Sequence, residues 1–177
     1  MVRFGARVAQ PGILETIISV LAKIHEESII VLTLKGWEFR VAEPAQGCQL
    51  YARILVDAVF EKFQLQSRDQ TICLSVSLVS LLKALKTCRG AETVNVALGK
   101  EDGVPVLRWG IIKGDNVKLI QSVPVKLESR KKIEATQEPN FPFEKSVRVR
   151  LPDPKKLKTG LERMNRVSSF QRDSFTF

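Results

Sequence analysis

The chain has 177 residues, of which 44% are hydrophobic, and it carries a formal net charge of +9. No apolar run approaches the roughly 20 residues that a helix needs to cross a bilayer, so we expect a soluble globular protein without a membrane partner. No long apolar segment follows the first residues, and we therefore expect no secretory signal.

The three cysteines, Cys48, Cys73 and Cys88, are odd in number and show no C-x-x-C spacing. This pattern favours reduced thiols over a disulfide framework or a zinc site. We therefore expect a reducing compartment, the cytosol or the nucleus.

The positive charge is concentrated toward the end of the chain. Residues 1–125 contain 15 Lys and Arg against 12 Asp and Glu, a net charge of +3, whereas residues 126–177 contain 13 against 7, a net charge of +6. Such an imbalance is typical of a protein with an acidic partner, most often nucleic acid, but it is also compatible with a solvated basic surface. Charge alone leaves both interpretations open.

Strand and helix patterns alternate from the first residues onward. Residues 3–9, RFGARVA, alternate as a strand does, and Pro11 and Gly12 end the pattern. Residues 13–24 have helical spacing. The predicted buried face of this helix consists of Ile13, Ile17, Val20, Leu21 and Ile24.

The next segment predicts a β-hairpin that turns at Lys35 and Gly36. Residues 47–66 are expected to be extended chain, and residues 71–77, TICLSVS, a further strand.

A second helix is predicted over residues 77–90, SLVSLLKALKTCRG, with Gly90 suited to its C-terminal end. Helical projection places Leu78, Val79, Leu81, Leu82 and Leu85 on its buried side. Lys83 and Thr87 lie opposite, Ser80 and Ala84 lie beside them, and Lys86 lies at the boundary.

Three strands follow, at residues 92–100, 104–114 and 116–127, with turns between them. The order strand, helix and three strands thus occurs twice, which predicts an α+β fold. The polar, proline-containing residues 126–145 are typical of a connector between domains.

A third copy of the starting pattern is predicted from residue 146. Shifting the chain by 143 positions aligns Arg150 with Arg7, Pro154 with Pro11 and Leu161 with Ile18. We therefore predict a first domain over residues 1–125, a connector over 126–145, and an incomplete second domain over 146–177 with no sheet to cover its helix.

The helix of this third copy has a strongly basic side. Leu157, Leu161 and Met164 form its apolar side, and Lys155, Lys156, Arg163 and Arg166 gather opposite with a single Glu162 among them. The helix over residues 13–25 is different, because Glu15, Ser19, Lys23 and Glu26 make its polar side nearly neutral.

Three passages resemble the checkpoint clamp subunits of the Hus-one (hydroxyurea-sensitive) family, which are sliding clamps of the proliferating cell nuclear antigen type. They are RFGARV at the start, LLKALKT over residues 81–87, and LPDPKKLKTGLERM over residues 151–164, preceded by QEP at 137–139. The resemblance covers residues 1 to about 168.

The resemblance implies a non-enzymatic subunit of the heterotrimeric nine-one-one ring, with sheets outside and helices lining a hole for double-stranded DNA. It implies no cofactor, and its partners would be two other clamp-like subunits, a clamp loader, and repair and checkpoint proteins in the nucleus and also the cytoplasm. The DNA-facing residues matched by the motifs are Lys83, Lys86, Lys158 and Arg163. Helical projection adds Lys155, Lys156 and Arg166, and Lys23 is a weaker candidate.

Two other functions remain open. A homotrimeric replication clamp is the nearest one, and a basic nuclease or stand-alone nucleic-acid-binding domain belongs to a different class. A two-metal nuclease centre would have to come from the scattered carboxylates Asp57, Glu61, Asp69, Glu101, Asp102 and Asp115. His25 is interpreted as a helix end, and Trp37 and Trp109 as packing residues, with base stacking as the alternative.

Overall fold

The computed structural model describes residues 2–43, 48–136, 138 and 153–173. The chain divides into two compact units, Met1–Glu138 and Pro139–Phe177. The predicted restart of the strand pattern at residue 146 and the tail from residue 174 lie outside the described residues. The described part of the second unit is one helix, α5 (Pro154–Asp173).

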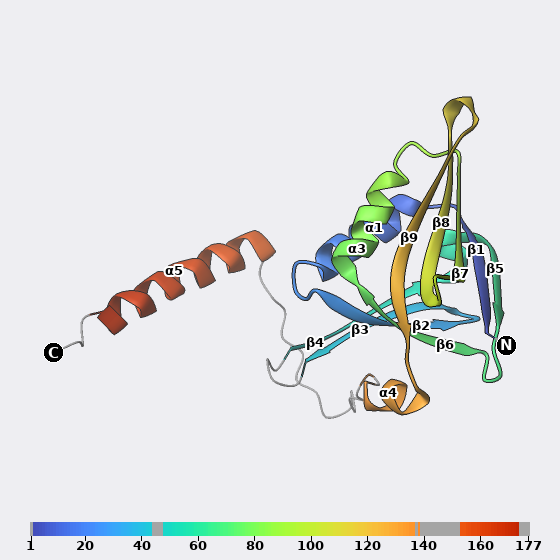
Figure 1. Ribbon diagram of the computed structural model, residues 1–177. Coiled ribbons are helices and arrows are strands. Elements are labelled where there is room, and N and C mark those ends of the chain that lie inside the picture. Colours follow the sequence, from blue (N-terminus) through green and yellow to red (C-terminus); the bar gives the residue numbers. More distant parts are fainter. Residues whose placement is uncertain (1, 44–47, 137, 139–152, 174–177) are drawn as a thin grey trace. The chain divides into compact units, whose positions relative to one another are not determined.

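The first unit is an antiparallel sheet of nine strands accompanied by helices (Figure 1). The strands are β1 (Arg3–Val8), β2 (Glu27–Thr33), β3 (Gly36–Glu43), β4 (Cys48–Leu55), β5 (Phe60–Gln66), β6 (Thr71–Ser77), β7 (Thr93–Glu101), β8 (Val104–Lys113) and β9 (Val117–Leu127). The helices are α1 (Pro11–Leu21), α2 (Val56–Val59), α3 (Leu78–Thr87) and α4 (Arg130–Ala135), with a 3-10 turn at Gly114–Asn116. The predicted strands, hairpin and two main helices are confirmed, but α2 interrupts the extended chain predicted over residues 47–66.

Four strands, β2 to β5, follow the first main helix where three were predicted, and three strands, β7 to β9, follow the second. The two repeats exchange their first strands. The strand order is β4-β3-β2-β6-β9-β8-β7-β1-β5. β1 pairs with β7 of the second repeat, with Gly5 opposite Ala97, and β6 pairs with β2 of the first, with Ile72 opposite Leu32. Neither repeat therefore completes its part of the sheet without the other, and the predicted α+β class is confirmed.

Both main helices pack against the same side of this sheet. Leu14 and Ile18 of α1 and Leu81 and Leu85 of α3 belong to one buried cluster together with side chains from the strands. Full burial of each of these aliphatic side chains contributes about 2 kcal/mol to the free energy of unfolding. This packing holds α1 and α3 in contact with one another.

The predicted buried face of α1 was wrong at three of its five positions. Leu21 is buried and Ile17 is partly buried against the core, as predicted. The buried residues are Leu14, Ile18 and Leu21, whereas Ile13 is 43% and Val20 is 52% exposed, and Ile24, in the turn after α1, is 44% exposed. Two adjacent apolar stripes run along this helix at the same spacing. Periodicity cannot choose between such stripes, because the choice depends on which one the sheet covers.

Two positions on α3 also differ from prediction. Ala84 is fully buried, whereas Val79 is 44% exposed. The sheet and α1 together cover a sector of the helix centred on Leu81 and Leu85. That sector includes Ala84 and leaves Val79 outside it.

Glycine is required at position 36, in the β2–β3 turn, because the backbone of Ile54 lies very close to it. A Cβ atom at this position would lie 1.9 Å from the backbone oxygen of Ile54. We predict that Gly36→Ala lowers the free energy of unfolding by at least about 3 kcal/mol, because the obstructing atoms are backbone. Urea denaturation measures this change.

Gly12→Ala is the matched control, because a Cβ atom there meets nothing within 4 Å. It lies in α1 and should change the stability by no more than about 1 kcal/mol. Equal effects of the two substitutions would contradict the role assigned to Gly36.

Candidate nucleic-acid interface

The ends of α3 are defined by local contacts. The side chain of Ser77 accepts a hydrogen bond from the backbone N–H of Ser80 at 3.3 Å, as an N-cap does. At the other end the backbone N–H of Cys88 donates to the oxygen of Leu85 at 3.0 Å. Gly90 follows with a φ of +70°, a left-handed conformation that suits glycine just beyond a helix. These contacts determine which residues the helix presents to solvent.

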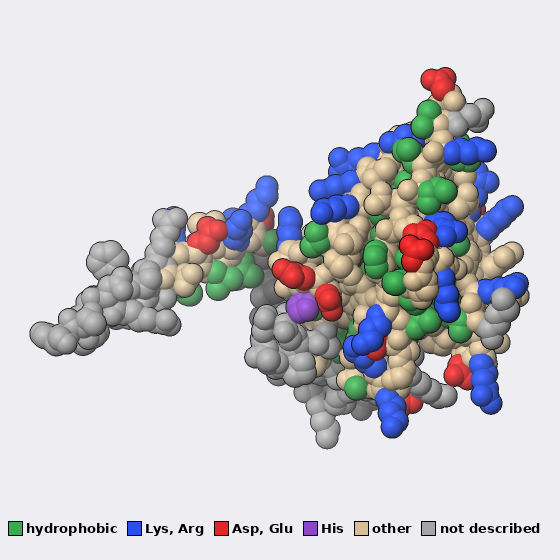
Figure 2. All heavy atoms as spheres, in the orientation of Figure 1, with side chains coloured by type: hydrophobic (Ala, Val, Ile, Leu, Met, Phe, Trp, Pro, Cys, Tyr) green, Lys and Arg blue, Asp and Glu red, His purple; other side chains and the backbone are tan. Residues whose placement is uncertain are grey.

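Lys83 and Lys86 are both exposed on α3. They lie away from Leu81, Ala84 and Leu85, which are buried in the core. Lys86 also lies in the last turn of the helix, where a cation complements the helix dipole. Figure 2 shows a group of Lys and Arg side chains beside the helices of the first unit, with others spread over the rest of its surface.

Arg89, immediately beyond α3, forms an ion pair with Glu15 of α1. Its Nε donates to Oε2 of Glu15 at 2.9 Å, and its Nη2 donates to Oε1. Hydrogen bonding to Arg89, and its positive charge together with that of Lys86, lower the pKa of the Glu15 carboxyl against the opposing effect of burial. The pair raises the pKa of Arg89 in turn.

Lys113, at the end of β8, adds a positive charge near the same end of α3. Burial raises the pKa of the Cys88 thiol to about 11, and the charge of Lys113 acts in the opposite direction. Neither Lys113 nor Arg89 was predicted from the sequence to be part of a basic surface. Arg89 lies only three residues after Lys86, and this spacing could have identified it. Lys113 lies in a strand, and no spacing in the sequence relates it to α3.

The face of α1 beside α3 contributes little positive charge. Lys23 is exposed in the turn that follows the helix, and Ile13, Val20 and Ile24 are exposed alongside it. The sequence correctly indicated that this polar side is close to neutral. Its apolar content was missed, because those side chains were expected in the core.

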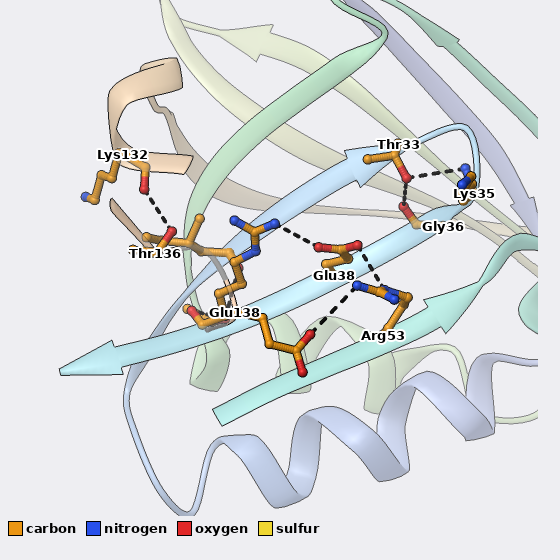
Figure 3. A network of polar contacts seen from close by, with 11 residues as sticks. Thr33, Lys35, Gly36, Glu38, Arg53, Lys132, Thr136 and Glu138 are labelled. Carbon is orange, nitrogen blue, oxygen red and sulfur yellow. Dashed lines mark hydrogen bonds and ion pairs between the residues drawn. The ribbon is translucent and has the colours of Figure 1, made fainter. Parts of the chain in front are cut away.

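The opposite face of the sheet carries a separate polar network (Figure 3). Glu38 of β3 accepts hydrogen bonds from Arg40 at 2.8 Å and from Arg53 of β4 at 2.9 Å. Arg53 also lies 3.9 Å from Glu138, beyond α4. Because Phe39 points into the core, its neighbours Glu38 and Arg40 point away from the helices.

The segment after β9 is held to this opposite face by Glu128. Its carboxylate accepts a hydrogen bond from the Ser75 hydroxyl at 2.8 Å and one from Lys132 at 3.0 Å. The Ser75 bond and the Lys132 bond lower the pKa of Glu128 against the opposing effect of burial. The first part of the predicted connector is therefore anchored on the side of the sheet that the main helices leave free.

A family model described as Hus1-like protein matches residues 2–172. The chain belongs to the Hus1-like family. Among solved structures it is similar to PCNA of Thermococcus kodakaraensis, with a TM-score of 0.55 and 17% sequence identity. That match covers 85% of this chain and 51% of the PCNA chain, so the Hus1-like chain spans about half the length of that clamp subunit. Comparison with curated proteins gave no match.

The likeness to PCNA shows that the Hus1-like chain has the DNA-clamp fold, as predicted. The predicted residues on α5 are exposed where the structure describes them. These are Lys155, Lys156, Lys158 and Arg163, and the side chain of Arg166 lies outside the described residues. Asp153 accepts a hydrogen bond from the backbone N–H of Lys155 at 2.8 Å, and Lys158 lies 3.8 Å from Glu162.

The apolar side of α5 is largely exposed. Leu161 is 57% and Met164 is 72% exposed, and Leu157 is partly buried. Such side chains on an amphipathic helix normally pack against another element.

The structure does not support base stacking by the two tryptophans of the Hus1-like chain. Trp37 is 1% and Trp109 is 0% exposed, and their rings pack edge to face with centroids 6.4 Å apart. Their location in the core confirms the packing interpretation.

The structure also does not support the alternative of a two-metal nuclease centre built from the carboxylates. Glu61 pairs with Arg7 at 3.1 Å, and Glu101 pairs with Arg108 at 3.0 Å. Within residues 2–43, 48–136 and 153–173, no group of three or more His, Cys, Asp or Glu side chains is arranged to hold a metal ion. No helix of the described chain is long and apolar enough to span a membrane.

His25 lies in the turn after α1, in agreement with its interpretation as a helix end. Its Nδ1 lies 2.8 Å from the backbone oxygen and 3.1 Å from the backbone nitrogen of Glu27. The ring thus shapes the connection from α1 to β2.

The Glu38 network predicts a pH-dependent contribution to stability. Burial acts to raise the pKa of Glu38, but hydrogen bonds and charge from Arg40 and Arg53 outweigh it, so the pKa is lowered. The ionised carboxylate therefore stabilises the fold at neutral pH, and this contribution is lost as the pH falls below the ordinary carboxyl range and through the lowered pKa.

We predict that Glu38→Gln lowers the free energy of unfolding at neutral pH by about 1–2 kcal/mol. The difference between variant and wild type should shrink as the pH falls from about 5 to about 3, when protonation neutralises the wild-type carboxylate as well. Urea denaturation at each pH tests this. Glu92→Gln, at an exposed carboxylate after α3, is the control, and a Glu38→Gln difference that stays constant with pH would contradict the prediction.

Proposed function

We propose that the chain is a non-enzymatic subunit of a heterotrimeric checkpoint clamp that encircles DNA and acts in DNA damage response and repair. The observation that supports this most strongly is the exposed pair Lys83 and Lys86, held outward on α3 in a protein of the Hus1-like family and clamp fold. Lys113 adds positive charge at the same end of the helix, where Arg89 is paired with Glu15.

Contacts from such residues would be made to phosphates. Lys side chains are flexible point charges, and phosphate contacts fix no base sequence. Binding of this kind is salt-sensitive, because each neutralised phosphate releases condensed counterions. The resulting weak and sequence-independent attraction is what a ring needs in order to move along a duplex.

Assembly with two other clamp-like subunits is supported by the edge of β9. β6 pairs only with Val125–Leu127 of this strand, so the outer edge of residues 117–124 has no strand neighbour in the described chain. Ile120 is 71%, Val117 is 48% and Leu119 is 37% exposed along the same stretch. An unpaired edge bordered by exposed aliphatic side chains suits pairing with a strand of another subunit.

α5 would contribute Lys155, Lys156, Lys158, Arg163 and Arg166 to the same DNA, as the start of a second clamp domain. Lys23 would be a peripheral contact, since the surface around it is largely apolar. A clamp loader and the repair and checkpoint proteins would bind surfaces other than the helical one. We assign the chain to the nucleus, and also the cytoplasm.

The test is the double variant Lys83→Glu/Lys86→Glu, examined in binding of the full chain to duplex DNA over a series of salt concentrations. We predict that it weakens binding at low salt by about tenfold or more and reduces the slope of log affinity against log salt by about 2. Thermal unfolding should be nearly unchanged, because both side chains are exposed.

Lys62→Glu/Arg68→Glu is the matched control, since it makes the same charge change at exposed positions in β5 and the following turn. It should weaken binding much less. Equal weakening by both variants would show attraction to net charge alone and would overturn the assignment of α3 to the DNA surface.

A further inference from the structure

One acidic side chain lies within the basic surface of α3. Glu15 projects from α1, the neighbouring helix, and its side chain is only 13% exposed, whereas that of its partner Arg89 is 70% exposed. The carboxylate receives two hydrogen bonds from the guanidinium of Arg89. Glu15 therefore binds the guanidinium of Arg89, whose side chain is otherwise exposed to solvent.

The Glu15–Arg89 pair lies at the end of a row of cations. Lys83, Lys86 and Arg89 follow one another at intervals of three residues, and all three are exposed. Arg89 therefore continues the row that begins on α3, just beyond the last helical turn. Lys86 also acts electrostatically on Glu15.

Carboxylate and phosphate compete for the same donors of an arginine. A guanidinium binds either group with two parallel N–H···O bonds, and its fork geometry suits both. While Glu15 occupies the Nε and Nη2 donors of Arg89, those donors are not available to a phosphate.

We infer that Glu15 limits the DNA affinity of this surface by withholding Arg89 from the phosphate backbone. This inference rests on the proposed function. The wild-type protein would then bind through its lysines, and loss of the Glu15 contact would add an arginine to the same row. Glu15 is thus a residue that tunes binding without contacting DNA, and it also links α1 to the end of α3.

The test compares three variants of the full chain in binding to duplex DNA over a salt series. Glu15→Gln should bind about 3- to 10-fold more tightly at low salt, with a slope steeper by about 1, as expected for one added phosphate contact. Arg89→Gln alone should weaken binding, because it leaves the Glu15 carboxylate without its partner beside Lys86. Glu15→Gln/Arg89→Gln should return to the wild-type affinity.

Two further variants separate this effect from a general change in charge. Glu92→Gln removes an exposed carboxylate close to the same end of α3 and should give a smaller gain than Glu15→Gln. Glu15→Asp keeps the charge but shortens the reach toward Arg89, and it should also strengthen binding. Thermal unfolding of each variant shows whether the helices remain in place, and Glu15→Asp carries the test if Glu15→Gln fails to fold.

The inference is overturned if Glu15→Gln and Glu92→Gln have equal effects, or if Glu15→Gln/Arg89→Gln binds DNA as tightly as Glu15→Gln alone. In either case a clear loss of affinity in Lys83→Glu/Lys86→Glu would leave the proposed function intact. If that lysine variant binds as the wild type does, the proposed function itself fails.

Discussion

The packing of α1 and α3 against one side of a shared sheet determines which of their residues face the solvent. Leu14 and Ile18 on one helix and Leu81 and Leu85 on the other are buried in the same core. The exchange of β1 and β6 between the two repeats makes that sheet continuous. With their apolar sides held in place, the helices can present only their remaining residues to solvent, and this gives Lys83 and Lys86 a fixed direction.

The two sides of the sheet consequently differ in chemistry. The helical side carries a row of cations in which Arg89 is paired with Glu15, whereas the opposite side carries networks centred on Glu38 and Glu128. A surface for a sliding partner has to attract phosphates without holding any one of them firmly. A carboxylate within the basic row fits that requirement, because it reduces the attraction without removing the lysines.

Much of this fold was predictable from the sequence because it is expressed in local patterns. The strands alternate, the turn at Gly36 has the expected composition, and the LLKALKT passage carries both the helix and its exposed lysines. The buried stripe of α1 was not predictable in the same way. Leu14, Ile18 and Leu21 repeat with the same spacing as Ile13, Ile17 and Val20, and only the position of the sheet selects between them.

Lys113 illustrates a second limit. It reaches the end of α3 from β8, so no periodicity connects it to the helix. The Glu15–Arg89 contact joins residues 74 positions apart and depends on how the two helices lie against each other. Interactions of this kind follow from tertiary packing and are not present in any one stretch of sequence.

The proposed encirclement of DNA can be tested with circular and linear DNA. The chain would be assembled with two other clamp-like subunits, loaded onto closed circular DNA by a clamp loader, and followed before and after a single cut that linearises the circle. We predict that the complex stays on the closed circle and is lost when the circle is cut. Equal retention on circular and linear DNA, or a ring formed by this chain alone, would contradict it.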